Sequence, residues 1–359
     1  MRRAFLVCAC MVACNAFSED LRPRDGVGGD GGVGEGATEG GLPAVDQEAK
    51  LIAPDDGSHR ALVATNEAFA WSTSKNAKNG LRIFGQSLAE GSAPQPFAPM
   101  PCGADTLSGY LFASGERIFA SNEGCFGWLC YFDAANPKQL NCAYDGNSGF
   151  YRLAGDAAGG LASEGGDGAD KEHRLRSFSP TFDSKVVVAQ GDVDVPDLSK
   201  NGSIDFTAST NAVYWTEVVE GSMLRVMVCG RPLSKCQTPA EILKPRAGAP
   251  VAIAATDDSV FVAYETSDRK SRLVRVTAGV EAPFATPSAS IGTLKIAGTN
   301  LVWNEGASME RAALDGSGKP EVIGHAPNGE AITHLAATPD GTKILLMTSQ
   351  GVYRLDLRK

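Results

Sequence analysis

A short pattern recurs along this 359-residue chain at intervals of about 45 residues. Each copy has a turn of small or polar residues and then an apolar run with an aromatic residue, as in residues 65–71, TNEAFAW. The turn residues that mark the seven copies are Asn66, Gly115, Gly159, Asn211, Asp258, Asn300 and Asp340, at spacings of 49, 44, 52, 47, 42 and 40. A unit of this size cannot bury its own apolar surface, so the copies must stack on their neighbours.

Within each copy the chain reads as four short strands, and no useful helical periodicity interrupts them. Four strands per period of this length predict an all-β fold, a β-propeller with seven blades. Six or eight blades are alternatives, because the copy near Gly159 is degenerate. The last copy offers three strands only, at 334–338, 343–348 and 352–357. We therefore expect residues 49–53 to supply its missing outer strand and to close the ring.

Two parts of the chain resemble known propellers. Residues 338–344, TPDGTKI, and 352–356, VYRLD, are similar to a TolB-type, WD40-like propeller repeat. The other copies, with aromatic second strands and a CxxxxxxC hairpin at 229–236, resemble propeller-bearing lipoproteins of the bacterial envelope. The resemblance covers residues 51–359 and implies a binding or scaffolding role, since propellers host many unrelated activities.

The N-terminus reads as an export signal. Arg2 and Arg3 precede a ten-residue apolar run, 4–13, which is too short to span a bilayer and predicts a signal peptide at 1–13. Residues 11–14, MVAC, resemble a bacterial lipobox, which predicts a lipid anchor on Cys14. Ordinary cleavage after Ala16 and a cytoplasmic chain are the alternatives. The expected location is the bacterial cell envelope, in the periplasm or at the cell surface, with lipid attachment to the outer membrane or, as the alternative, to the inner one.

Residues 14–50 form the predicted tether. Nine of the sixteen residues 26–41 are glycine, and acidic residues lie among them, so the segment has little to bury and is expected to be disordered. Residues 26–31 fit G-x-G-x-x-G by chance, because no strand precedes them and no helix follows. The whole chain has a net charge of −9 and no basic run. A nucleic-acid partner is therefore not expected, and the lipid is the expected membrane contact.

Nine cysteines divide into groups. Two belong to the signal peptide and one is Cys14, which leaves an even number for disulfides in an exported chain. The firmest predicted pair is Cys229–Cys236, because the two residues flank a turn that contains Gly and Pro. We favour Cys130–Cys142 and Cys102–Cys125 among the fifteen possible connectivities. A zinc site is the alternative, but the chain has no C-x-x-C pair and no His close to these cysteines.

No catalytic motif stands out: G-x-S-x-G, H-E-x-x-H and the phosphate-binding loop are absent, and the four His are scattered. A non-catalytic binding module without a cofactor is the prediction, and a metal-dependent, lactonase-like periplasmic enzyme is the alternative. One segment imitates a calcium loop, with oxygen donors at Asp197, Ser199, Asn201 and Asp205. It lacks the Glu at position 12 and flanking helices, so a polar loop between blades is the preferred interpretation.

An acid ends the second strand of five successive blades. These residues are Glu123, Glu164, Glu217, Glu265 and Glu305. Equivalent positions of a propeller fall at one radius on one face, so the five carboxylates are expected to form an arc at a binding rim. Such an arc would attract a cationic partner, an envelope protein or a cell-surface ligand. The alternative is a solvated strand-end residue repeated by duplication, with a neighbouring Arg or Lys as its partner.

Overall fold

The computed structural model describes most of the chain from residue 48 onward. The described residues are 48–54, 59–73, 82–96, 109–122, 128–133, 136–144, 149–156, 159–165, 173–178, 189–195, 205–219 and 223–357. Residues 44–359 form one compact unit. The predicted signal peptide, Cys14 and nearly all of the tether lie outside the described residues, as do Cys102, Cys125, Glu123, Asp197, Ser199 and Asn201.

The described strands form seven four-stranded antiparallel sheets, which we number as blades in chain order. Blade 1 contains β2 (His59–Ala64), β3 (Ala68–Thr73), β4 (Arg82–Ser87) and β5 (Gln95–Pro96). Blade 2 contains β6 (Gly109–Ser114), β7 (Arg117–Asn122), β8 (Trp128–Asp133) and β9 (Asn136–Tyr144). Blade 3 contains β10 (Gly149–Asp156), β11 (Gly159–Gly165), β12 (His173–Phe178) and β13 (Ala189–Val195).

The second half of the ring continues this order. Blade 4 contains β14 (Phe206–Ala208), β15 (Ala212–Val219), β16 (Met223–Gly230) and β17 (Ala240–Ala247), with the 3-10 helix η2 (Leu233–Lys235). Blade 5 contains β18 (Ala249–Ala255), β19 (Ser259–Glu265), β20 (Ser271–Thr277) and β21 (Val280–Ala285). Blade 6 contains β22 (Ile291–Ala297), β23 (Asn300–Glu305), β24 (Ser308–Ala313) and β25 (Glu321–His325), followed by η3 (Pro327–Gly329). Blade 7 contains β26 (His334–Ala337), β27 (Lys343–Met347), β28 (Gly351–Asp356) and β1 (Lys50–Pro54).

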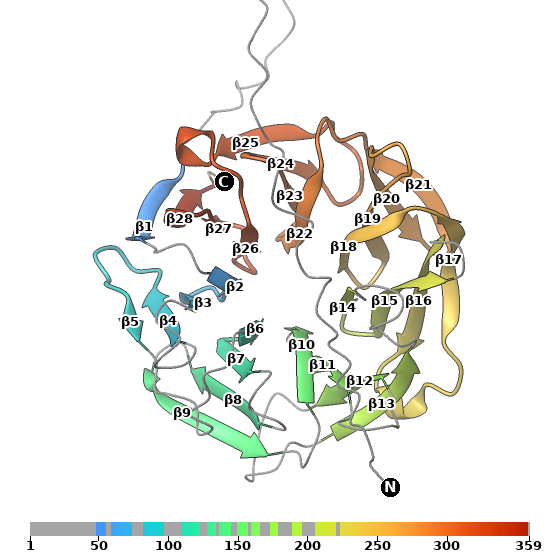
Figure 1. The fold of residues 1–359 in the computed structure, drawn as a ribbon, viewed down its shortest axis with the longest axis horizontal. Coiled ribbons are helices and arrows are strands. Elements are labelled where there is room, and N and C mark those ends of the chain that lie inside the picture. Colours follow the sequence, from blue (N-terminus) through green and yellow to red (C-terminus); the bar gives the residue numbers. More distant parts are fainter. Residues whose placement is uncertain are drawn as a thin grey trace, which may run out of the picture. The chain divides into compact units, whose positions relative to one another are not determined.

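The blades stand around a common centre, and the sequence runs once around the ring (Figure 1). The first strand of each chain-order blade is innermost, and each contacts the first strand of the next blade, including β26 against β2. The fold is therefore the all-β, seven-bladed propeller that the repeat predicted.

The repeated turn residues close the inner hairpins. Thr65 Oγ1 accepts hydrogen bonds from the backbone N of Glu67 (3.2 Å) and of Ala68 (3.0 Å), and it donates to Ala68 O. Thr256 and Thr338 hold the corresponding turns of blades 5 and 7 in the same way. A short side chain with both a donor and an acceptor suits this position, because it satisfies backbone groups at the turn. The repeat seen in the sequence is thus in part a repeat of turn chemistry.

The core lies between neighbouring blades. The second strands are buried on both faces because adjacent blades cover both faces of each sheet, as in β23, where the four residues 301–304 are all buried. Trp215 and Trp303 are fully buried, and each belongs to a cluster drawn from two adjacent blades. A fully buried large side chain contributes on the order of 2–3 kcal/mol through removal of its surface from water.

The ring is closed by β1, which pairs antiparallel with β28 as the outer strand of blade 7. This confirms the role predicted for residues 49–53. The propeller begins earlier than predicted, however: Lys50 lies in β1, and Glu48 bridges to His325 of β25. Ala49 is buried within the apolar cluster between blades 6 and 7, which explains why these residues, assigned to the tether from the sequence, are held by the propeller.

Two disulfides are present among the described residues. Cys130–Cys142 joins directly opposite positions of β8 and β9, with a Cα–Cα distance of 4.0 Å. Cys229–Cys236 joins the end of β16 to the residue after η2, at 5.7 Å. Both are pairs favoured from the sequence. In the described part of the chain, no helix has the length and apolar character needed to cross a membrane.

Candidate functional site

The two faces of the propeller differ in which connections they carry. We call the face with the turns between the first and second strands of each blade the turn face. Residues 298–299 of blade 6 and 338–342 of blade 7 lie on it. The ends of the second strands, where the predicted glutamate rim falls, lie on the opposite face.

Glu217 does not belong to an exposed rim, because its side chain is only 4% exposed. Its Oε1 accepts a hydrogen bond from Trp215 Nε1 (2.7 Å), and its Oε2 accepts one from Arg225 Nε (2.6 Å). Residues two apart on a strand share a face of the sheet, which places the Trp ring beside the carboxylate. The carboxylate therefore anchors its own blade.

Glu305 repeats this Trp–Glu contact in blade 6. Trp303 Nε1 donates to Glu305 Oε1 (2.9 Å). Glu305 Oε2 accepts from the backbone N (2.8 Å) and Oγ (2.7 Å) of Ser288 and from the backbone N of Ala289 (3.1 Å). It holds the connection that leads from blade 5 into blade 6.

The predicted charged arc is thus corrected for two of its members. Glu217 pairs with a neighbouring Arg, as the alternative expected, but it is buried and not solvated, and Glu305 contacts Trp303, Ser288 and Ala289 with no Arg or Lys partner in the described chain. Glu265 is half-buried at the end of β19, whereas the Glu164 side chain lies outside the described residues. The sequence analysis did not predict these contacts, although a Trp stands two residues before each Glu, Trp215 and Trp303.

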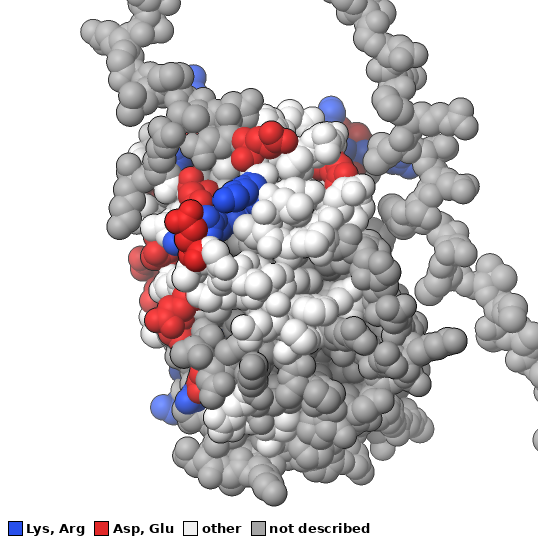
Figure 2. Space-filling view, turned by 90° about the vertical axis from the view of Figure 1, so that its left-hand side faces the viewer, with Lys and Arg blue, Asp and Glu red and all other residues white. Residues whose placement is uncertain are grey.

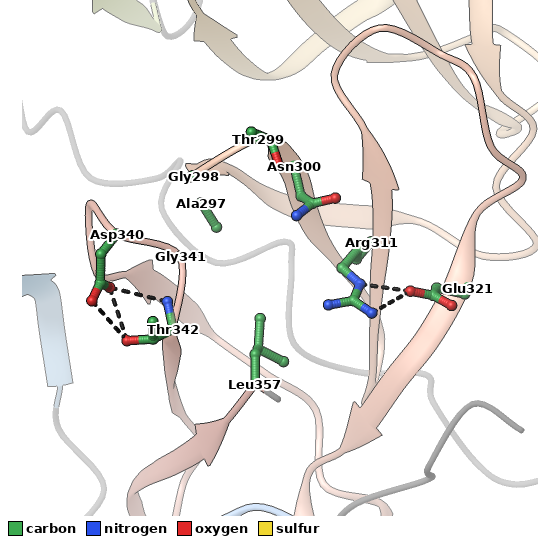
Figure 3. A pocket seen from close by; sticks show the side chains of 10 residues that line it. All are labelled: Ala297, Gly298, Thr299, Asn300, Arg311, Glu321, Asp340, Gly341, Thr342 and Leu357. Carbon is green, nitrogen blue, oxygen red and sulfur yellow. Dashed lines mark hydrogen bonds and ion pairs between the residues drawn. The ribbon is translucent and has the colours of Figure 1, made fainter. Parts of the chain in front are cut away.

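A hollow of about 410 Å³ opens on the turn face between blades 6 and 7 (Figure 3). We call it the 6/7 hollow. Its polar wall comprises Asn300, Arg311 and Glu321 of blade 6 and Asp340 and Thr342 of blade 7, with Leu357 below them. Its size falls in the range of sites for small ligands.

The strand register within blade 6 determines where its residues stand in the wall of the 6/7 hollow. Val302 is paired with Arg311 of β24, which is paired in turn with Glu321 of β25. Val302 belongs to the core between blades 6 and 7, so Arg311 and Glu321 face blade 7 as well. Asn300 lies two residues before Val302 and shares that face.

Arg311 and Glu321 form an ion pair in which each partner keeps one polar atom available for a further hydrogen bond. Arg311 Nε (2.6 Å) and Nη2 (2.5 Å) both contact Glu321 Oε1. Within the described part of the chain, Arg311 Nη1, Glu321 Oε2 and the Asn300 amide have no hydrogen-bond partner. In Figure 3 the third guanidinium nitrogen faces the middle of the hollow.

Asp340 forms the facing wall from the turn between β26 and β27. Its Oδ1 accepts from Thr338 Oγ1 (2.6 Å) and from the backbone N of Thr342 (3.0 Å), and the Thr342 hydroxyl lies 2.9 Å from both carboxylate oxygens. Burial opposes ionisation, but these hydrogen bonds outweigh it and hold the pKa of Asp340 below its ordinary value. The carboxylate therefore stays charged at neutral pH.

Two glycines let the turns of blades 6 and 7 approach each other. A Cβ at Gly341 would lie 2.7 Å from the carbonyl carbon of Ala297, and its φ is +70°. A Cβ at Gly298 would lie 3.2 Å from the Asp340 carbonyl oxygen. From the other side, Asn66 Oδ1 of blade 1 accepts a hydrogen bond from the Asp340 backbone N (3.0 Å). The spacing of the walls is therefore set by backbone contacts.

A smaller hollow of about 170 Å³ lies on the turn face between blades 7 and 1. Several of its polar groups are already bonded: Gln86 Nε2 donates to Ser92 O (2.7 Å), and Arg354 Nη1 donates to Leu88 O (3.4 Å). Figure 2 shows the side of the molecule near β1, where acidic and basic side chains are mixed along one border. No single sign of charge dominates that view, so the 6/7 hollow is the stronger candidate site.

Asp205 is the described member of the predicted calcium loop. Its Oδ1 accepts from the backbone N of Phe206 (3.1 Å), and its Oδ2 accepts from the backbone N of Ile253 (3.1 Å) in blade 5. It therefore joins blades 4 and 5. Among the described residues no three His, Cys, Asp or Glu side chains gather as metal ligands would. The calcium site stays a prediction.

The fold is a WD40-like β-propeller, and comparison with solved structures agrees. The matches include a chain of the crystal structure of a mitotic checkpoint complex (TM-score 0.55, 11% identity, 91% of this chain and 100% of that chain). The crystal structure of RRP9 WD40 repeats has a TM-score of 0.56 at 11% identity and covers 87% of this chain and 98% of that one. A prolyl endopeptidase matches with a TM-score of 0.55 at 12% identity, over 86% of this chain and 51% of that one.

No protein-family profile and no curated protein sequence matches the chain. At identities this low the structural likenesses show the fold alone. A chain of a checkpoint complex and a prolyl endopeptidase share it, so the function has to be argued from the site.

Proposed function

We propose that the chain is a non-catalytic binding or scaffold module that holds a protein partner at the bacterial cell envelope, with a lipid on Cys14 as its anchor. The 6/7 hollow carries the proposal. It combines a backbone-fixed shape with polar groups on Arg311, Glu321 and Asn300 whose hydrogen bonds are not all made within the described chain. Such groups are well placed to accept a partner.

The chemistry of the hollow favours binding over catalysis. Its lining contains Asn, Thr, an ion pair and a low-pKa carboxylate, and among the described lining residues there is no His or Cys. A carboxylate held below its ordinary pKa is a poor general base, because catalytic bases work best with a pKa near the operating pH. Fixed donors and acceptors around a small apolar floor are instead typical of recognition sites.

Partner capture tests the binding role. The tagged full chain is cross-linked in intact bacterial envelopes and purified, and captured proteins are identified and quantified. Thr299 is exposed at the hollow, so Thr299→Trp should fill it. Gln350→Trp places the same bulk on an exposed turn of the opposite face and serves as the control.

The expected result is one partner held at a fixed ratio by wild type and Gln350→Trp, and lost from Thr299→Trp. Equal capture by all three proteins would place binding elsewhere and contradict the proposal. A stoichiometric metal in the purified protein, together with a hydrolytic activity, would favour an enzyme.

The anchor is tested separately. A clickable fatty-acid analogue should label the wild-type chain in a bacterium that processes lipoproteins, and the chain should sediment with membranes. Cys14→Ser should lose both the label and the sedimentation. An unlabelled, freely soluble wild-type chain would reject the anchor while leaving the binding role open to the capture experiment.

A further inference from the structure

The middle of β22, the innermost strand of blade 6, carries a charged residue. Lys295 lies there, and β22 is one of the first strands that surround the centre of the ring (Figure 1). The Lys295 side chain is exposed, so solvent reaches the middle of this strand. No other Lys, Arg, Asp or Glu occurs among the described side chains of the seven first strands. Within the described part of the chain, Lys295 is therefore the one cation that the first strands present to solvent.

Lys295 has no direct partner among the described residues, with which it makes neither a hydrogen bond nor an ion pair. The carboxylate whose charge acts on it is Asp205. Asp205 immediately precedes β14 of blade 4, and blade 5 stands between blades 4 and 6 in the ring (Figure 1). The interaction therefore passes along the inner side of blade 5, which indicates that the Lys295 amine points toward the centre of the ring.

The protein around the amine disfavours its charge. Burial at the centre lowers the pKa of Lys295, and the charge of Asp205 offsets only part of this decrease. The half-buried side chains on the other first strands are small and mostly apolar; they include Ala61, Val63, Ala113, Ala208, Ala255 and Ala337. In such surroundings an opposite charge attracts the ammonium more strongly than it would in bulk water.

We propose that the centre of the ring is an anion site at which Lys295 binds an aliphatic carboxylate. The ammonium has three N–H donors and no acceptor, and it donates charge-assisted hydrogen bonds to the carboxylate oxygens. The aliphatic tail of the ligand lies against the small apolar side chains of the first strands. A free short-chain acid and the side chain of a Glu in a partner segment share this chemistry. The site is separate from the 6/7 hollow and goes beyond the proposed function.

Other ligand classes fit less well. A phosphate dianion would bring a second negative charge toward Asp205, and the described side chains of the first strands offer no second cation to hold it. A cationic ligand would be repelled by Lys295. A neutral amide of the same shape would leave the ammonium without a counter-charge.

NMR on the full chain labelled with 13C at the lysine Cε positions tests the inference. The Lys295 signal is identified by its absence in Lys295→Met. Sodium butyrate, butyramide, sodium phosphate or sodium chloride is added at millimolar concentrations and neutral pH. We expect butyrate to shift the Lys295 signal with saturation and to bind at least about tenfold more tightly than butyramide or phosphate, a factor that corresponds to about 1.4 kcal/mol.

Matched variants locate the anion. Lys295→Met keeps the aliphatic stem and removes the charge, and it should fold normally because no partner of Lys295 is lost. Butyrate binding, followed through the butyrate methyl signals, should be lost in Lys295→Met. Lys270→Met removes an exposed Lys that pairs with Asp268, and it should bind butyrate like wild type. Thr299→Trp fills the 6/7 hollow and should also leave butyrate binding unchanged.

The peptide acetyl-Gly-Glu-Gly-amide separates the two sources of the carboxylate. A shift of the Lys295 signal by both butyrate and the peptide supports a partner's acidic side chain, and a shift by butyrate alone supports a free acid. Equal shifts with butyramide or chloride, or undiminished butyrate binding by Lys295→Met, would overturn the inference. These outcomes leave the partner-capture experiment untouched, so the anion site and the proposed function stand or fall separately.

Discussion

Blade 6 carries a glutamate near each end, and the two are used differently. On the opposite face, Glu305 accepts hydrogen bonds at both oxygens from Trp303, Ser288 and Ala289. On the turn face, Glu321 contacts Arg311 through one oxygen and keeps the other open within the described chain. Glu305 has counterparts in other blades, whereas the Arg311–Glu321 pair has no repeat in the sequence pattern. Glu305, which repeats between blades, stabilises the fold, whereas Glu321, which does not, keeps one carboxylate oxygen available to a partner.

The largest expected effect is on stability at the opposite face. Glu217→Ala should lower the free energy of unfolding by about 3 kcal/mol, because the Trp215 and Arg225 donors lose their buried acceptor. Urea unfolding measures the loss, and partner capture should be unchanged. Glu265→Ala, at a half-buried rim position whose side chain makes no hydrogen bond within the described chain, should cost less than about 0.5 kcal/mol. Equal losses in the two variants would contradict the structural role of the Trp–Glu contact.

The next largest effect is expected from replacing a glycine on the turn face, compared with replacing one on the opposite face. Gly341→Ala should destabilise the protein by about 2.5 kcal/mol and weaken partner capture, because the added Cβ meets the Ala297 backbone and its φ is positive. Gly306→Ala, at a positive-φ turn of the opposite face with open space around it, should cost about 1 kcal/mol and leave capture intact. Thermal unfolding and capture, measured on both variants, check this. Lost capture in Gly306→Ala would show that the effect is not specific to the turn face.

A smaller effect is expected at the connection between blades 5 and 6. Glu305→Gln should cost about 1.5 kcal/mol, because an amide NH2 would then face donors that now meet Oε2. Hydrogen exchange of the Ser288 and Ala289 amides should become faster. Ser288→Ala removes the hydroxyl contact alone and should change the exchange of Ala289 much less. Unaltered exchange in Glu305→Gln would show that this carboxylate does not hold the connection.

The smallest effect concerns pH. Because the folded pKa of Asp340 is depressed, its stabilising contribution is present above the pKa of an unfolded Asp and is lost as pH falls through the lower folded value. The difference in melting temperature between wild type and Asp340→Asn should therefore be constant near neutral pH and shrink in acid. Asp340 is exposed, so the difference corresponds to less than about 1 kcal/mol. A difference that grows in acid would contradict the direction of the shift.

Much of the fold could be predicted from the sequence because turn chemistry repeats with the blade. Thr65, Thr256 and Thr338 each close an inner hairpin, and their spacing reports the period directly. The closing strand could be predicted from the missing fourth strand of the last copy. Both features can be read from the sequence alone, because neither requires knowledge of three-dimensional contacts.

The 6/7 hollow could not be predicted in the same way. Arg311 and Asp340 line one hollow only when blade 7 packs on blade 6, and this packing depends on the close approach at Gly341. The roles of two members of the predicted glutamate rim were missed for a related reason. Spacing placed Glu217 and Glu305 correctly on one face but did not reveal their partners, although the Trp two residues before each could have done so.

The pairing of β1 with β28 has a consequence for how the protein is made. The two strands lie about 300 residues apart in the chain, so at translation rates of about 5–20 residues per second β1 waits roughly 15–60 s for its partner to be synthesised. Ala53, buried in the finished ring, has no native neighbour in β28 during that interval. A chain with six blades folded is therefore an open arc whose two end blades each leave one apolar face uncovered, with β1 as an unpaired strand. Ring closure becomes the last step of folding and the stage most exposed to pairing with another chain.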